Sequence, residues 1–126
     1  MNKKLRMKIY DKYNGRCAYC GSEIKYENMQ VDHLHPLSVC RTNLEVRDSF
    51  ENLMPSCRIC NHYKRAYLLE SFRKLMLTLH ERIENIYIIK VAIRFGLLKL
   101  EKFNGNFYFE NIINYELLDM TEDEND

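Results

Sequence analysis

Two pairs of cysteines, each separated by two residues, constrain the fold of this 126-residue chain more than any other feature. The pairs are Cys17 with Cys20 and Cys57 with Cys60. Two intervening residues let both thiolates bind one ion while the backbone turns tightly, a unit called a knuckle below. Two knuckles complete a tetrahedral zinc site. The spacing therefore predicts one structural zinc ion, the alternatives being a redox-active pair or unliganded buried cysteines.

The cellular compartment affects how these cysteines are interpreted. Charged and aromatic residues follow the basic start of the chain, where a signal peptide needs an apolar stretch. The most apolar window, 86–100, contains three basic residues and is too short to cross a bilayer. We therefore expect a cytoplasmic protein without a membrane span, in which cysteines bind metal rather than form disulfides. The fifth cysteine, Cys40, belongs to neither pair and is expected to be a loop or core thiol.

Charge divides the chain into two halves. Residues 1–66 contain 12 Lys and Arg against 7 Asp and Glu, whereas residues 67–126 contain 7 against 11. The front half is therefore the half suited to a phosphate backbone. The acidic residues near the end predict a solvated tail.

Apolar periodicity predicts the order of the elements along the chain. We expect helices over 3–13, 68–86 and 88–98, a strand over 30–34, a loop over 37–49, and a hairpin over 103–109 with Asn-Gly as its turn. Length favours a single domain over 1–126. Within it we expect a core at about 13–66, a helical extension at about 67–118 and an acidic tail at 119–126.

A group of polar residues lies between and just after the knuckles. The segment Val31-Asp32-His33-Leu34-His35-Pro36 is followed by Asn52-Leu53, and the second knuckle runs into Asn61-His62-Tyr63-Lys64. The order of these residues resembles that of the HNH endonuclease family, in its zinc-knuckle branch. The resemblance covers Tyr13 to about Lys64. The resemblance implies an α+β protein with a ββα-metal core. In that core two antiparallel strands and a helix surround one divalent metal ion.

Chemistry and the resemblance assign the same roles. Phosphodiester hydrolysis needs a base for water and an electrophile for the phosphate. His33 is the natural base, because histidine ordinarily titrates nearest neutral pH. Asp32 offers a hard oxygen for Mg²⁺ or Mn²⁺, and the Asn61 amide oxygen offers a second. The resemblance gives Asn52 the role of holding the loop so that His33 stays aimed.

Two departures from the family pattern leave alternatives open. Asn61 stands where the family often has histidine, so His62 is an alternative ligand. The Gly-Gly often found after the proline is replaced by residues 38–43. His35 shares a strand face with His33, so it either reaches phosphate or metal or packs beside Pro36.

The basic residues within and just after the second knuckle are Arg58, Lys64 and Arg65. They are expected to contact phosphate near a helix start, the alternative being a solvated basic face. The predicted function is a metal-dependent DNA endonuclease that nicks one strand. The rival is a zinc-stabilised nucleic-acid-binding module without catalysis. That rival gives no reason for Asp32, His33, Asn52 and Asn61 to occur together.

Overall fold

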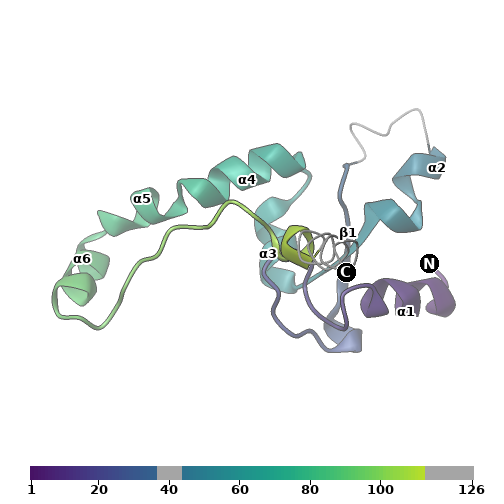
Figure 1. Cartoon of the computed structure of the whole chain (residues 1–126), viewed down its shortest axis with the longest axis horizontal. Helices are drawn as coiled ribbons and strands as arrows, with labels where there is room; N and C mark the ends of the chain where they lie inside the picture. The colour runs from purple at the N-terminus through teal and green to yellow at the C-terminus, as the bar shows by residue number, and fades with distance from the viewer. Residues whose placement is uncertain (37–43, 113–126) are drawn as a thin grey trace, which may run out of the picture. The chain divides into compact units, whose positions relative to one another are not determined.

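The structure is a computed structural model that describes residues 1–36 and 44–112 (Figure 1). The predictions made for Cys40, for the loop after Pro36 and for the acidic tail lie outside these residues. The chain divides into two compact units. The first unit comprises Met1–Leu68 and Phe107–Asp126, and the second comprises Leu69–Asn106. The prediction of one domain with a helical extension stays a prediction.

A two-stranded antiparallel sheet lies at the centre of the first unit. Strand β1 is Gln30–His33 and strand β2 is Leu53–Ser56, with Asp32 opposite Met54 and His33 opposite Leu53. Helix α3, Arg58–Lys64, begins directly after β2 and packs against β1. The mixed α+β class and the ββα order are therefore confirmed.

The amino-terminal helix packs under this sheet. Helix α1 is Lys3–Asp11, and its N-cap Asn2 accepts a hydrogen bond from the Leu5 N–H at 2.8 Å. Its buried Ile9 packs with Met29 and Leu53. The unit also contains the short helical segments η1 (Tyr26–Asn28), α2 (Leu44–Arg47) and η2 (Phe50–Asn52). Of these, α2 falls within 37–49, where the sequence predicts a loop without periodicity.

The hairpin predicted over 103–109 is wrong. Residues 108–112 are helical, and no strand occurs in this segment. The Asn104 side chain accepts from the Asn106 N–H at 2.9 Å, and Glu110 accepts from the Phe107 N–H at 2.9 Å. These bonds make a local turn and a helix start, so the N–H groups that a hairpin needs are already used. The next two N–H groups, of Tyr108 and Phe109, donate to knuckle carbonyls.

The second unit consists of helices. They are α4 (Leu69–Leu77), α5 (Leu79–Glu84) and α6 (Tyr87–Arg94). The sequence predicts one helix over 68–86, but Thr78 interrupts it because its hydroxyl donates toward the Lys74 and Leu75 carbonyls at 3.1 and 3.4 Å. Within the described part of the chain, no helix combines the length and apolarity needed to span a membrane.

Candidate metal and nuclease site

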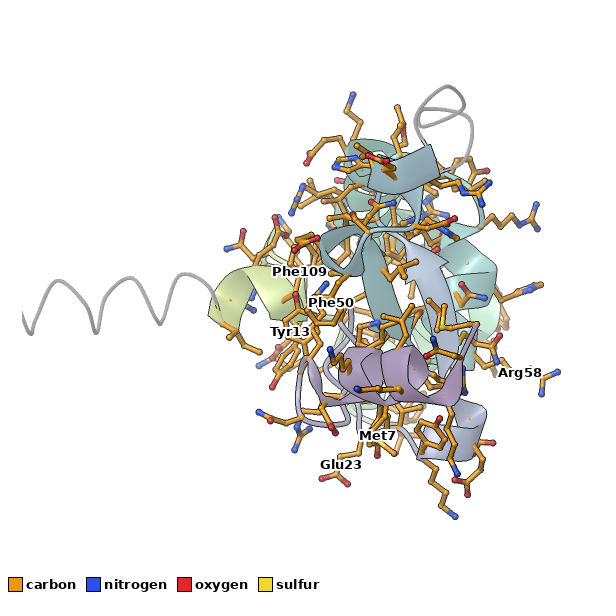
Figure 2. All side chains as sticks on the ribbon, turned by 90° about the vertical axis from the view of Figure 1, so that its right-hand side faces the viewer. Met7, Tyr13, Glu23, Phe50, Arg58 and Phe109 are labelled. Atoms are coloured by element: carbon orange, nitrogen blue, oxygen red, sulfur yellow. The ribbon has the colours of Figure 1, made fainter. Side chains whose placement is uncertain are left out.

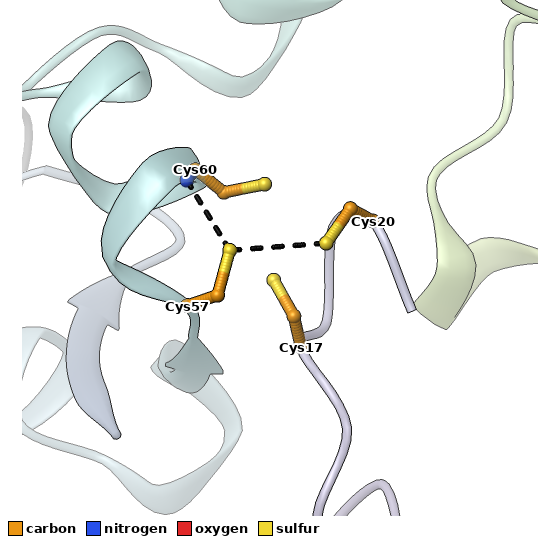
Figure 3. A group of neighbouring side chains, drawn as sticks. All are labelled: Cys17, Cys20, Cys57 and Cys60. Carbon is orange, nitrogen blue, oxygen red and sulfur yellow. Dashed lines mark hydrogen bonds between the residues drawn. The ribbon is translucent and has the colours of Figure 1, made fainter. Parts of the chain in front are cut away.

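The four paired cysteines form a single cluster (Figure 3). Their sulfur atoms all lie within 4.8 Å of one another, and the Cys20 and Cys57 sulfurs are 3.8 Å apart. A disulfide needs about 2.05 Å. A tetrahedron of thiolates at about 2.3 Å from zinc has edges of about 3.8 Å. The cluster therefore fits one metal ion bound by four sulfurs, which is the predicted arrangement.

Local backbone geometry brings the first knuckle to the sheet. The Ala18 N–H donates to the Pro55 carbonyl of β2 at 2.8 Å, and the Cys17 N–H donates to the Ser22 carbonyl at 2.9 Å. Gly21 closes the turn with φ +78°, and a Cβ there would lie 2.8 Å from the Tyr108 ring. A glycine is required at this position for both reasons.

Crowding of the sulfurs perturbs their protonation. Hydrogen bonds with Cys17 and Cys20, together with burial, raise the pKa of Cys60 far above its ordinary range. Hydrogen bonds with Cys17 and Cys60 lower the pKa of Cys20. In the metal-free chain the cluster therefore retains protons that a zinc ion must displace.

Asp32 is one of the buried residues of the polar site. It is 7% exposed, and its Oδ2 accepts a hydrogen bond from the Tyr19 hydroxyl at 2.5 Å. The same oxygen lies 2.9 Å from the ammonium of Lys64, which is 0% exposed and also donates to the His33 carbonyl at 3.1 Å. Burial, reinforced by the charge of Asp32, raises the pKa of Tyr19, so its hydroxyl remains a donor.

His33 follows Asp32 on β1, so its side chain leaves the opposite face of the strand. Its imidazole is 30% exposed, with Nε2 3.4 Å from Oδ1 of Asp48. Arg47 donates to both oxygens of that carboxylate, at 2.9 and 2.8 Å. These hydrogen bonds from Arg47, followed by the one from His33, lower the pKa of Asp48. Asp48 is therefore an anion placed beside the predicted base.

The buried side chain of Asn52 ties two loops together. Its Oδ1 accepts from the His35 N–H at 2.8 Å, and its Nδ2 donates to the Arg47 and His35 carbonyls at 2.8 and 3.2 Å. The segments joined in this way flank His33 on one side and Asp48 on the other.

The remaining predicted residues differ in exposure. Asn61 is half-buried and precedes Lys64 by three residues on α3, so the two share the helix face that packs on β1. His62 is exposed, and within the described ranges no hydrogen bond or ion pair joins it to Asp32 or His33. His35 is also exposed and lies beyond the end of β1. Arg65 is exposed at the end of α3.

Arg58 and Lys64, both predicted to contact phosphate, have opposite environments. The Arg58 side chain is exposed and extends away from the first unit (Figure 2). The expectation for Lys64 needs revision, because its ammonium is fully buried and paired with Asp32. From the sequence alone, a basic residue that follows a knuckle is indistinguishable from an exposed phosphate-binding residue. The pairing becomes visible only when α3 is packed on β1.

Sequence reasoning did not single out Tyr19 or Asp48. Tyr19 stands between the two cysteines of the first knuckle, a local signal that was available. Asp48 belongs to a segment without periodicity, where no sequence signal indicated which side chain reaches His33.

Comparison with known proteins assigns the segment that contains the cysteine cluster and the polar site. The model of the HNH endonuclease family matches residues 17–66. The chain carries an HNH endonuclease domain. This HNH segment is also similar to a CRISPR-associated endonuclease Cas9 of Corynebacterium diphtheriae, with 36% identity over 59 residues. That match covers 47% of this chain and 5% of the relative.

The HNH domain contains two sets of side chains whose chemistry suits metal ions. The four thiolates fit zinc, as shown above, whereas Asp32 and Asn61 offer oxygen atoms suited to a hard divalent cation. Asp32 and Asn61 come from β1 and α3, which pack together. The chemistry of this donor set therefore suits a divalent ion.

Proposed function

We propose that the chain is a metal-dependent DNA endonuclease that nicks one strand. The observation that carries this proposal is the placement of Asp32, His33 and Asn61 on the packed β1 and α3 of an HNH domain. These residue types are those that phosphodiester hydrolysis requires. One site per chain makes one cut per binding event, so nicking is the simplest outcome.

His33 is the proposed general base. Asp48 lies nearest its Nε2, at 3.4 Å. When Nε2–H donates to that carboxylate, Nδ1 is left as the acceptor for the proton of the attacking water. Asp48 also stabilises the imidazolium that results. A distance of 3.4 Å is typical of a substrate-free site that tightens when substrate binds.

Asp32 and Asn61 are the proposed protein ligands of the catalytic ion, Mg²⁺ or Mn²⁺. When bound, this ion supplies positive charge for the phosphate and the leaving 3′ oxygen. Two protein ligands leave coordination positions for phosphate and water, as Mg²⁺ prefers. Asn61 is favoured over His62 because it lies on the α3 face that packs on β1, while His62 is exposed. His35 is placed outside the ligand set for the same reason.

Zinc has a structural role in this proposal. A closed shell of four thiolates offers no open position for water or phosphate. It fixes the start of α3, where Cys57 is the N-cap and its sulfur accepts from the Cys60 N–H at 3.3 Å. Zinc thereby fixes the position of α3 relative to β2 and, because β2 pairs with β1, relative to β1 as well.

Basic side chains of the first unit are the proposed DNA-binding groups. Arg58 and Arg65 are exposed at the two ends of α3, and residues 1–66 carry an excess of positive charge. Phosphate contacts of this kind do not depend on base sequence. The cytoplasmic location remains a prediction.

The direct test is supercoiled plasmid incubated with zinc-loaded protein, with and without added Mg²⁺ or Mn²⁺. We expect conversion to open-circular DNA that requires the added ion and stops with EDTA. The rival, a zinc-stabilised module that binds nucleic acid without catalysis, predicts binding with no conversion under any ion. Asp32→Asn serves as the matched control, since it removes the charged ligand and eliminates ion-dependent cleavage.

A further inference from the structure

Tyr19 connects the zinc cluster to the polar site through a single side chain. It lies between Cys17 and Cys20, its side chain is buried, and its hydroxyl donates to Oδ2 of Asp32 at 2.5 Å. The ring packs edge-on against Phe107 and Phe109, with centroids 5.6 and 6.3 Å away. The aromatic contacts and the knuckle backbone together leave the hydroxyl little freedom to move.

Both donors to Asp32 bind the same oxygen. Tyr19 and Lys64 approach Oδ2, at 2.5 and 2.9 Å. In the part of the chain that the structure describes, Oδ1 accepts no hydrogen bond. A carboxylate held at one oxygen has a fixed orientation about its last torsion, so the direction of the other oxygen is fixed as well. That second oxygen is the one available to a hard cation.

The geometry points to Tyr19 as a positioning residue for the divalent-ion site. We propose that its hydroxyl fixes the Asp32 carboxylate, so that the zinc knuckle sets the orientation of a ligand of the catalytic ion. This inference rests on the proposed function, because it takes Asp32 as that ligand. It adds a dependence of one metal site on the other.

Packing alone does not account for this hydroxyl. A phenylalanine at position 19 would keep the edge-on ring contacts with Phe107 and Phe109. A buried hydroxyl is unfavourable unless it is hydrogen-bonded, and this one is bonded to Asp32. The supporting frame is rigid, since the neighbouring Ala18 N–H is bonded to the Pro55 carbonyl at 2.8 Å.

The test compares Tyr19→Phe with Tyr10→Phe, using zinc-loaded protein without DNA. The Tyr10 hydroxyl donates to the Ile24 carbonyl at 2.8 Å, so the control also removes one hydroxyl hydrogen bond from the same unit. Mn²⁺ binding is measured by electron paramagnetic resonance of the free ion. Loss of a partner that orients a metal ligand lowers affinity by about 10–100-fold. We expect this loss for Tyr19→Phe and none for Tyr10→Phe.

Cleavage gives a second readout. In Tyr19→Phe the Mn²⁺ concentration for half-maximal nicking should rise, while the rate at saturating Mn²⁺ stays close to that of the wild type. In the Asp32→Asn background the Tyr19→Phe change should leave Mn²⁺ binding unaltered, because the hydroxyl acts through the Asp32 carboxylate. A purely structural role would lower the free energy of unfolding and leave the Mn²⁺ dissociation constant unchanged.

The outcomes separate this inference from the proposed function. Unchanged Mn²⁺ affinity in a zinc-loaded Tyr19→Phe protein, with a wild type that binds Mn²⁺ and cleaves, overturns the inference alone. A wild type that binds no Mn²⁺ overturns both. If Tyr19→Phe does not retain zinc, wild-type protein with cadmium-113 in the zinc site replaces it. Its NMR resonance should then shift when Mg²⁺ is added, and an unshifted resonance overturns the inference.

Discussion

Replacing Lys64 by methionine tests the buried ion pair at the centre of the first unit. The Lys64 side chain is 0% exposed and that of Asp32 is 8% exposed, with the charged atoms 2.9 Å apart. Methionine fills much of the same volume but leaves the carboxylate buried without its counter-charge. Removing one partner of a buried pair costs about 3–5 kcal/mol. We expect the free energy of unfolding to fall by that amount.

The measurement is guanidinium unfolding followed by circular dichroism at a fixed free zinc concentration. Lys8→Met is the matched control, because Lys8 is exposed on α1, where a charge contributes little. The double variant Asp32→Asn with Lys64→Met should recover part of the loss, since no charge then remains unpaired. A Lys64→Met protein within about 1 kcal/mol of Lys8→Met, the range of a surface pair, would refute the buried pairing.

Four further predictions concern the loops, the DNA and the zinc. Asn52→Ala should lower the free energy of unfolding by about 1–3 kcal/mol and slow nicking, because loop N–H and carbonyl groups lose their hydrogen-bond partner. The control Asn28→Ala changes an exposed asparagine and should have neither effect. Arg58→Ala should weaken binding of unrelated DNA sequences equally and make the dependence on salt shallower, as filter binding would show. Zinc affinity should rise with pH, about tenfold per unit for each proton displaced, because the raised pKa of Cys60 keeps this ligand protonated at low pH; a pH-independent affinity in a chelator competition would contradict this. Cys57→Ser should unfold the first unit rather than merely lower the nicking rate. If circular dichroism and elemental analysis showed this variant to be folded and free of zinc, the result would count against the structural role of zinc.

The cysteine cluster and the ββα order were predictable because each depends on local sequence. Two residues between cysteines determine the geometry of a knuckle, and joining two knuckles fixes both ends of the insert between them. The start of α3 lies within the second knuckle, and strand β1 is a short local run that ends before Pro36. The candidate ligands Asp32 and Asn61 could therefore be named before their positions in space were known.

Features that depend on packing between elements were not predictable in the same way. The burial of Lys64 results from the packing of α3 on β1, which places a lysine beside Asp32. Asn104-Gly105 is a strong hairpin signal, yet Glu110 and the knuckle carbonyls bind the N–H groups that the hairpin would use. The contact of Asp48 with His33 comes from the turn after α2, in a segment that has no apolar periodicity.

The nicking rate of His33→Ala tests the central claim most directly. The variant removes the proposed proton acceptor and leaves the zinc ligands, Asp32 and the exposed arginines in place. We expect zinc content, folding and DNA binding to be retained, while Mg²⁺-dependent nicking of supercoiled plasmid falls by about 10²–10⁴-fold. Added imidazole should restore part of this rate and should not restore that of Asp32→Ala. A nicking rate equal to that of the wild type, measured for zinc-loaded His33→Ala protein purified free of other nucleases, would contradict the account.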